Sequence, residues 1–209
     1  MNWDDKNEVL IAIKKSWFNL EYASNELKND KEVILEAIKT NGGALKYASK
    51  ELRADKEIVM EAVDNSFGYA LQYAGDELKN DREFVLKIVK KWGNSLEYVS
   101  RELKNDKEIV MTAIKQYFYA LEYASYKLKN DKNFIFQIIK QDGQVLQFVS
   151  DELRNDKSFI LKAVNLDGNN LYYASDELKN DKEIVFEAVK NNKKALHYAS
   201  DEFKNNKNL

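Results

Sequence analysis

One string of about 25 residues recurs along almost the entire chain. Between Asn29 and Asp55 it reads N-D-K-E-V-I-L-E-A-I-K-T-N-G-G-A-L-K-Y-A-S-K-E-L-R-A-D. A period of this length indicates a stacked-repeat fold, in which each repeat packs on its neighbours. Eight repeats align on their Lys-rich start: 6–30, 31–55, 56–81, 82–106, 107–131, 132–156, 157–181 and 182–206. The sequence therefore predicts an all-α solenoid of eight tandem helix-loop-helix repeats, a curved superhelical rod that forms one repeat domain over residues 1–209.

Each repeat is predicted to begin with a short helix, which in repeat 2 covers roughly residues 30–40. Its apolar block, Val33–Ile38, is too wide for a one-sided surface helix, so neighbouring repeats are expected to cover it on both sides. Asn29 is the candidate N-cap, with Glu32 completing a capping box. Gly42 is expected to end the helix in the left-handed conformation. Equivalent glycines follow in three later repeats: Gly93, Gly143 and Gly168.

A second helix is predicted from about Ala44 to Arg53, because Leu45, Ala48 and Leu52 would lie on one stripe. The equivalent of Leu45 is Leu in every repeat, and an aromatic residue follows two positions later. Positions that repeat in this way indicate packing between repeats. Repeat 3 has one extra residue, which we place within Asn65–Tyr69.

Composition narrows the class of protein. The chain has 33 basic and 35 acidic residues, so no overall field attracts it to nucleic acid or to an anionic membrane. It has no cysteine, which excludes disulfides and thiolate metal sites. No apolar run approaches the length of a membrane span, and the polar start at Met1–Lys6 does not resemble a signal peptide. We expect a monomer in the cytoplasm, or one delivered into the cytoplasm of a host cell.

The sequence offers little for catalysis. His197 is the only histidine, with Asp201 four residues later, and a histidine without a nucleophile is not a catalytic set. Motifs for nucleotides and for catalytic zinc are absent. Carboxylate pairs such as Asp151-Glu152 and Asp176-Glu177 are copied between repeats, whereas an active site should be unique. We predict that the chain is not an enzyme and uses no cofactor, metal or small-molecule substrate.

Candidate binding residues are sought where the repeats differ from one another. The first set lies in the loop between the two predicted helices, where aromatic residues replace small polar ones. Its members are Trp17, Phe18, Phe67, Tyr69, Trp92, Tyr117, Phe118 and Tyr119. Aromatic residues are enriched at binding hot spots, so these rings could form a strip along one edge of the first five repeats. Alternatively, each ring packs against the adjacent loop and enlarges the core.

The second set is a row on the predicted second helix, where positions i and i+4 would share a face. Its candidate binding residues are Lys46, Lys50, Arg101, Tyr126 and Tyr172. The row is basic at its start and acidic from Asp151 onward. This polarity suits a charged protein surface better than a phosphate backbone, which would require basic residues throughout.

The string L-x-Y-A-S-x-E-L-K-N-D-K-E-I-V-x-E-A-V, at Leu171–Val189, resembles a family of short helical repeats known as a domain of unknown function. The resemblance covers residues 6–206, and the family occurs in bacterial, protist and algal proteins, some of which act on host cells. It implies a repeat scaffold without an active site or ligand. The weakest matches are repeat 5, with Tyr117–Tyr119 and Tyr126, and repeat 1, with Trp17-Phe18.

Two functions are compatible with these features. The first is a non-catalytic scaffold that occupies the surface of a partner protein, as an inhibitor, an adaptor, or a host- or defence-directed effector such as an anti-CRISPR-like protein. The second is a binder of nucleic acid or ribonucleoprotein. Its basic contacts would be Lys46, Lys50, Arg53, Lys90, Lys91 and Arg101.

Overall fold

The computed structural model describes residues 1–205, and all their regular structure is helical. Asn206, the last residue of the predicted eighth repeat, and residues 207–209 lie outside the described part. The chain divides into two compact bodies, Met1–Tyr123 and Ala124–Leu209, called here the N-terminal and the C-terminal body. The prediction of an all-α array of helical repeats is confirmed. No helix among residues 1–205 is long and apolar enough to cross a membrane.

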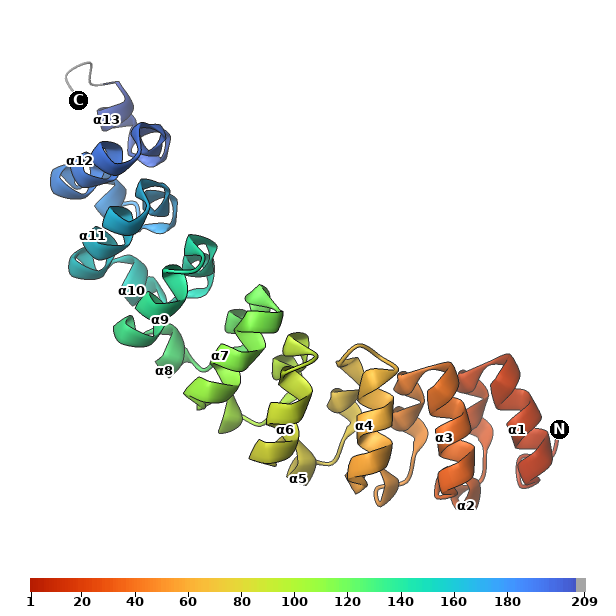
Figure 1. Cartoon of the computed structure of the whole chain (residues 1–209). Helices are drawn as coiled ribbons and strands as arrows, with labels where there is room; N and C mark the ends of the chain where they lie inside the picture. The colour runs from red at the N-terminus through yellow and green to blue at the C-terminus, as the bar shows by residue number, and fades with distance from the viewer. Residues whose placement is uncertain (206–209) are drawn as a thin grey trace. The chain divides into compact units, whose positions relative to one another are not determined.

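The first helix of each repeat is an α-helix that begins at a Lys or Arg. In the N-terminal body these helices are α1 (Lys6–Lys15), α3 (Lys31–Thr40), α4 (Lys56–Asp64), α6 (Arg82–Val89) and α7 (Lys107–Gln116). In the C-terminal body they are α9 (Lys132–Ile139), α11 (Lys157–Leu166) and α12 (Lys182–Asn191). Helices of successive repeats pack together, as α1, α3 and α4 do side by side in Figure 1.

The N-cap of these helices is the aspartate, so the prediction of Asn29 as the cap was wrong by one residue. Asp30 Oδ1 accepts hydrogen bonds from the backbone N–H groups of Glu32 (2.9 Å) and Val33 (3.2 Å). A carboxylate also suits the positive end of the helix dipole. Glu32 does not complete a capping box, because its carboxylate pairs with Lys6 Nζ of the preceding repeat at 2.7 Å.

The predicted continuous second helix, Ala44–Arg53, is not present. A 3-10 helix, η2 (Gly42–Tyr47), is followed by Ala48 in an extended conformation and by the short turn η3 (Leu52–Ala54). The chain breaks because the Ser49 N–H donates to the Lys28 carbonyl of the preceding repeat (2.9 Å). Ser49 Oγ then accepts from the Leu52 N–H (3.2 Å), so the serine caps a new turn.

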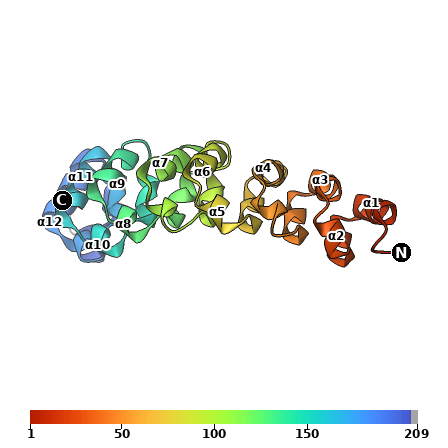
Figure 2. The ribbon, with the colours of Figure 1, turned by 90° about the horizontal axis from the view of Figure 1, so that it is seen from below.

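The same sequence of a 3-10 helix and a short turn recurs along the chain. The 3-10 helices that follow the other first helices are η1 (Trp17–Tyr22), η4 (Tyr69–Tyr73), η5 (Gly93–Tyr98), η7 (Phe118–Tyr123), η8 (Gly143–Phe148), η9 (Gly168–Tyr173) and η11 (Lys193–Tyr198). The short turns are α2 (Asn25–Lys28), α5 (Asp76–Lys79), η6 (Leu103–Asn105), α8 (Tyr126–Lys129), α10 (Asp151–Arg154), η10 (Leu178–Asn180) and α13 (Asp201–Lys204). In Figure 2, α3 and α4 are seen nearly end-on, with the 3-10 layer beside them.

The repeated glycines permit close stacking and do not adopt the left-handed conformation that we predicted for Gly42, Gly93, Gly143 and Gly168. A Cβ on Gly42 would lie 2.0 Å from the Ala62 carbonyl oxygen of the next repeat, and one on Gly168 would lie 2.2 Å from the Ala188 carbonyl oxygen. Among the described residues, positive φ occurs only at Phe67 (52°) and Gly68 (94°). Both lie in the loop that carries the extra residue of repeat 3.

Leucines form the centre of the 3-10 layer. Leu45 and its equivalents in the first seven repeats are completely buried. Burial of a leucine side chain contributes about 1.5–3 kcal/mol to stability, so this row holds the two layers together. The repeated leucine is therefore a core position in these repeats.

Ion pairs connect the starts of successive α-helices. The first basic residue of one repeat contacts the N-cap aspartate of the next, as in Lys6–Asp30 (2.7 Å) and Lys157–Asp181 (2.8 Å). The hydrogen bond from Lys6 lowers the pKa of Asp30. At Asp156 the hydrogen bond from Lys132, with a second one from Ser158, lowers the pKa to about 2. The repeating Lys and Asp therefore act as links between repeats.

Candidate interaction surfaces

The first candidate surface is formed by aromatic residues at the ends of α1, α4, α6 and α7, all in the N-terminal body. This set, the loop-edge aromatics, consists of Trp17, Phe18, Phe67, Tyr69, Trp92, Tyr117, Phe118 and Tyr119. Because α1, α3 and α4 run side by side in the same direction (Figure 1), the loops that follow them lie along one edge. The exposed rings are Phe18, Phe67, Tyr69, Tyr117 and Tyr119, and the other three are half-buried.

Phe67 and Trp92 form the most constrained cluster of this edge. The Phe67 ring is 67% exposed and meets the Trp92 ring edge-on, with 5.3 Å between the ring centroids. Trp92 Nε1 donates to Asp64 Oδ1 at 2.8 Å, and Asn94 Nδ2 donates to the Phe67 carbonyl at 2.9 Å. Contacts from repeats 3 and 4 therefore hold the indole and the Phe67 backbone, while the phenyl ring faces solvent.

Smaller ring clusters lie on either side of this one in sequence. Trp17 stacks on Phe18, with 3.7 Å between the ring centroids, and also contacts Tyr47 of repeat 2 at 6.1 Å. In repeat 5 the Tyr119 ring lies 5.7 Å from the Tyr117 ring and 5.5 Å from the Phe118 ring. Both alternatives predicted from the sequence therefore occur. Trp17 and Trp92 pack between repeats, whereas Phe18 and Phe67, which contact them, remain exposed.

The second candidate set does not share one helical face. Lys46 lies in η2, whereas Lys50 follows the extended residue Ala48, so the i, i+4 relationship of a continuous helix does not hold. The same break separates His197 in η11 from Asp201 in α13. All five candidate side chains are nevertheless exposed: Lys46, Lys50, Arg101, Tyr126 and Tyr172.

The two tyrosines of this set have different surroundings in the C-terminal body. A hydrogen bond to Glu152 raises the pKa of Tyr126. Tyr172 packs edge-on against Tyr173 and Tyr198, with centroid distances of 4.9 and 5.3 Å. Tyr126 thus contacts a carboxylate, whereas Tyr172 belongs to a cluster of rings.

The basic residues considered for nucleic acid are partly engaged with other side chains. Lys91 Nζ lies 2.9 Å from Asp64 Oδ1 and also over the Trp92 ring. Lys46 Nζ lies over the Tyr47 ring, 5.3 Å from its centroid. The ammonium groups of Lys46 and Lys91 therefore already contact aromatic rings, and that of Lys91 also contacts a carboxylate.

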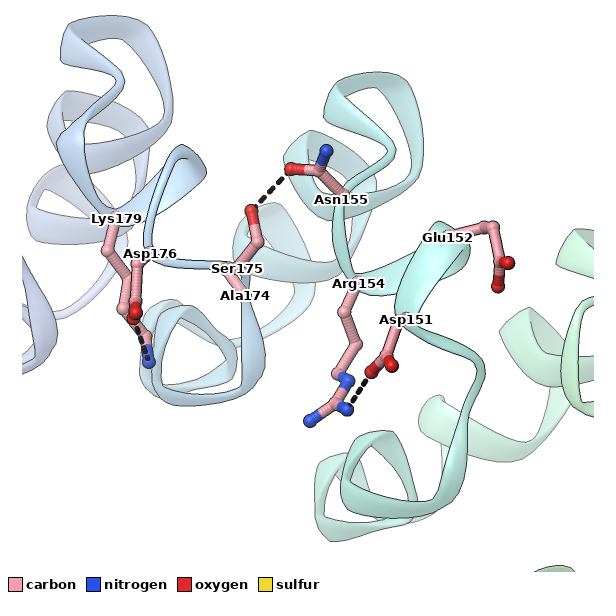
Figure 3. A pocket seen from close by; sticks show the side chains of 8 residues that line it. All are labelled: Asp151, Glu152, Arg154, Asn155, Ala174, Ser175, Asp176 and Lys179. Atoms are coloured by element: carbon pink, nitrogen blue, oxygen red, sulfur yellow. Dashed lines mark hydrogen bonds and ion pairs between the residues drawn. The ribbon is translucent and has the colours of Figure 1, made fainter.

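A cavity of 560 Å³ lies in the C-terminal body, and four of its charged side chains form two pairs (Figure 3). Arg154 pairs with Asp151, and Lys179 Nζ lies 3.9 Å from Asp176. Ser175 Oγ donates to Asn155 Oδ1 at 2.5 Å across the boundary between repeats. Each ion pair lies within one repeat, and the Ser175–Asn155 bond joins repeats 6 and 7. Among residues 1–205, no group of three or more potential metal ligands is present.

A family model for short repeats matches the chain six times, over residues 5–53, 55–104, 81–129, 106–154, 131–179 and 156–204. The model is described as "Domain of unknown function (DUF4116)". The chain belongs to this family. No curated protein and no solved structure matches it.

The DUF4116 matches follow the structural repeat. Each match covers two repeats, and each begins at the N-cap aspartate of an α-helix: Asp5, Asp55, Asp81, Asp106, Asp131 or Asp156. The family pattern therefore corresponds to pairs of stacked repeats.

One polar and aromatic cavity of this DUF4116 chain was missed from the sequence. Asp142 and Asp167 occupy, in the C-terminal body, the loop position held by Trp92 and Tyr117 in the N-terminal body, and they line a cavity with Tyr172. The sequence signal was the appearance of Asp at this position in two consecutive repeats.

Proposed function

We propose that this DUF4116 protein is a non-catalytic scaffold that binds another protein through the loop-edge aromatics of its N-terminal body. It would act by occupying the partner's surface, as an inhibitor or adaptor does. Aromatic residues at interface hot spots contribute large apolar contact areas, and burial of an exposed phenylalanine is favourable by about 1.5–3 kcal/mol.

The geometry of Phe67 is the observation that carries this proposal. A non-glycine residue with φ of 52° is uncommon, and such a conformation costs on the order of 1–3 kcal/mol. The strained residue carries a large apolar ring, and that ring is mostly in water. Burial of the Phe67 ring within this chain does not offset the strain, whereas burial against a partner protein would. Trp92 and Asn94 already hold the residue in position, which lowers the cost of binding.

The test uses substitutions taken from other repeats, so that the fold is retained. In Phe18→Gln/Phe67→Asn/Tyr119→Asn, three of the five exposed rings are replaced, each by a polar residue that occurs at the same position elsewhere: Gln144, Asn41 and Asn169. Asn also tolerates positive φ at position 67. The control is Ile11→Glu, which removes an exposed apolar side chain of α1 and introduces the residue present at Glu36 in α3.

Wild type and both variants are immobilised and exposed to lysate of the source cell, and the proteins retained are quantified by mass spectrometry. A retained candidate is then purified and its Kd is measured against each variant. We expect the triple variant to lose at least about tenfold in affinity and Ile11→Glu to match wild type. Equal affinity of the triple variant and wild type for the partner would show that the loop-edge aromatics do not bind it.

A further inference from the structure

A second cavity in the C-terminal body has a composition that differs from the rest of the surface. It has a volume of 360 Å³ and is lined by the 3-10 helices η8, η9 and η11 of three successive repeats, with the residues that cap them. Its charged and aromatic lining consists of Asp142, Asp167, Tyr172, Tyr173 and Tyr198. No lysine or arginine is among its lining residues, so the lining combines two carboxylates with aromatic rings.

The two carboxylates are held in place without being neutralised. Asp142 Oδ1 accepts a hydrogen bond from the Gln144 N–H (2.8 Å), and Asp167 Oδ1 accepts one from the Asn169 N–H (2.9 Å). Within residues 1–205 neither carboxylate forms an ion pair with a basic side chain. Asp30, Asp156 and Asp181 differ in this respect, because a lysine of the preceding repeat pairs with each of them.

Tyr172 departs from the repeat at this cavity. The equivalent positions hold Glu, Lys, Gln or His in the other seven repeats, so stacking does not require an aromatic ring there. The ring is nevertheless held edge-on against Tyr173 and Tyr198 and is 56% exposed. Lys179 Nζ lies 5.8 Å from the centroid of this ring, so the ring already has an ammonium group within cation–π distance.

We propose that this cavity binds the cationic side chain, arginine or lysine, of a basic segment in a partner protein. Two fixed carboxylates supply charge-assisted acceptors for a guanidinium or ammonium group, and the tyrosine rings supply cation–π contacts. A volume of 360 Å³ is near the lower limit of ligand pockets, which fits one inserted side chain. A phosphate backbone would be repelled by the same carboxylates.

The cavity lies in the C-terminal body, whereas the loop-edge aromatics of the proposed function lie in the N-terminal body. The two proposals share only the premise that the repeats bind a polypeptide.

The repeats themselves supply variants that change the cavity and keep its backbone. Asn41 Oδ1 and Asn192 Oδ1 accept the equivalent backbone hydrogen bond at 2.7 and 3.0 Å. Asp142→Asn/Asp167→Asn therefore keeps both caps and removes both charges. Tyr172→Gln installs the residue found at the same position of repeat 6, Gln147, and removes only the ring.

The experiment is an NMR titration of the full chain at low ionic strength with three peptides, Ac-Gly-Ser-Xaa-Ser-Gly-NH2, in which Xaa is Arg, Lys or Gln. The amide signals of Gly143 and Gly168 report on the cavity. We expect saturable shifts with the Arg or the Lys peptide and none with the Gln peptide. Affinity should fall at least about tenfold in Asp142→Asn/Asp167→Asn and about threefold in Tyr172→Gln.

Three outcomes would overturn the proposal: no saturable shift with either basic peptide, equal shifts with the Gln peptide, or unchanged affinity in the Asp142→Asn/Asp167→Asn variant. The triple variant of the loop-edge aromatics, Phe18→Gln/Phe67→Asn/Tyr119→Asn, is the matched control and should bind the peptides as wild type does. Because the peptides are synthetic, failure here is distinct from failure of the proposed function, which is measured at the N-terminal body with a cellular protein.

Discussion

Ser49 Oγ donates a hydrogen bond of 2.6 Å to Asn29 Oδ1, from one repeat to the preceding one. The same bond recurs as Ser100–Asn80, Ser150–Asn130, Ser175–Asn155 and Ser200–Asn180. At one boundary both partners are replaced together: Gly75 stands where Ser is expected and faces Ala54, which replaces Asn. The two positions therefore behave as one unit of the interface between repeats.

Restoring this pair should stabilise the boundary between repeats 2 and 3. Gly75 has φ of −60° and room for a side chain, since a Cβ there has no neighbour closer than 3.6 Å. We expect Gly75→Ser alone to contribute a few tenths of a kcal/mol as a cap, and Ala54→Asn alone almost nothing. The double variant should add a coupling energy of about 1 kcal/mol in a double-mutant cycle by urea unfolding. A coupling energy of zero would show that the pair is incidental.

Adding a methyl group at the close-packed glycines should destabilise the array. Gly42→Ala and Gly168→Ala force the next repeat away from its present position, at an expected cost of about 1–3 kcal/mol. Gly75→Ala is the matched control, because that site has space for a Cβ and should change stability little. The free energy of unfolding is measured by urea titration with circular dichroism. Equal stability of all three variants would contradict the close approach of the repeats.

The ion pair between Lys132 and Asp156 should make part of the stability dependent on acid pH. The folded pKa of Asp156, about 2, lies below its ordinary value of 3.8. The unfolded chain therefore binds the proton first, and this stabilisation is complete above about pH 4 and lost as the pH falls towards 2.

In Lys132→Met, the difference in unfolding free energy from wild type should be constant above about pH 4 and should shrink towards pH 2. It is measured by urea unfolding at a series of pH values. A difference that persists unchanged at pH 2 would show that the lysine acts through packing of its aliphatic chain.

Trp92→Phe tests whether the indole hydrogen bond positions the Phe67 loop. The substitution keeps an aromatic ring and removes only the donor to Asp64, so we expect a loss of about 0.5–1.5 kcal/mol. Amide exchange at Gly68, whose N–H donates to the Val63 carbonyl at 2.9 Å, should accelerate as the loop opens more often. Exchange at Gly42, which lies in repeat 2, serves as the internal reference. Unchanged exchange at Gly68 would mean that other bonds hold the loop without the indole, namely those from Asn94 Nδ2 to the Phe67 carbonyl and from Ser95 Oγ to the Gly68 carbonyl (3.1 Å).

Much of the architecture could be predicted from this one sequence, because its eight repeats can be aligned with one another. Positions that stay the same indicate packing, and positions that vary indicate surface. The period predicted the array, and Val33, Ile34, Ala37 and Ile38 were correctly placed as a core covered on both sides. The loop-edge aromatics were recognisable because they break the repeat. Their division into exposed and half-buried rings depends on contacts with a neighbouring repeat, such as that of Trp92 with Asp64, which local pattern does not specify.

The sequence by itself determined the all-α fold and its repeating first helix, since these follow from hydrophobic periodicity and from the repeat. Only the tertiary structure decided the second half of each repeat. Ser49 could have continued a helix on local propensity, but its N–H is taken by a carbonyl of the preceding repeat, and the helix breaks there. Gly42 could likewise have been a helix terminator, but the approach of Ala62 from the next repeat decides its role. Hydrogen bonds between repeats compete with hydrogen bonds within a repeat. Which of them forms depends on the groups that stacking brings together.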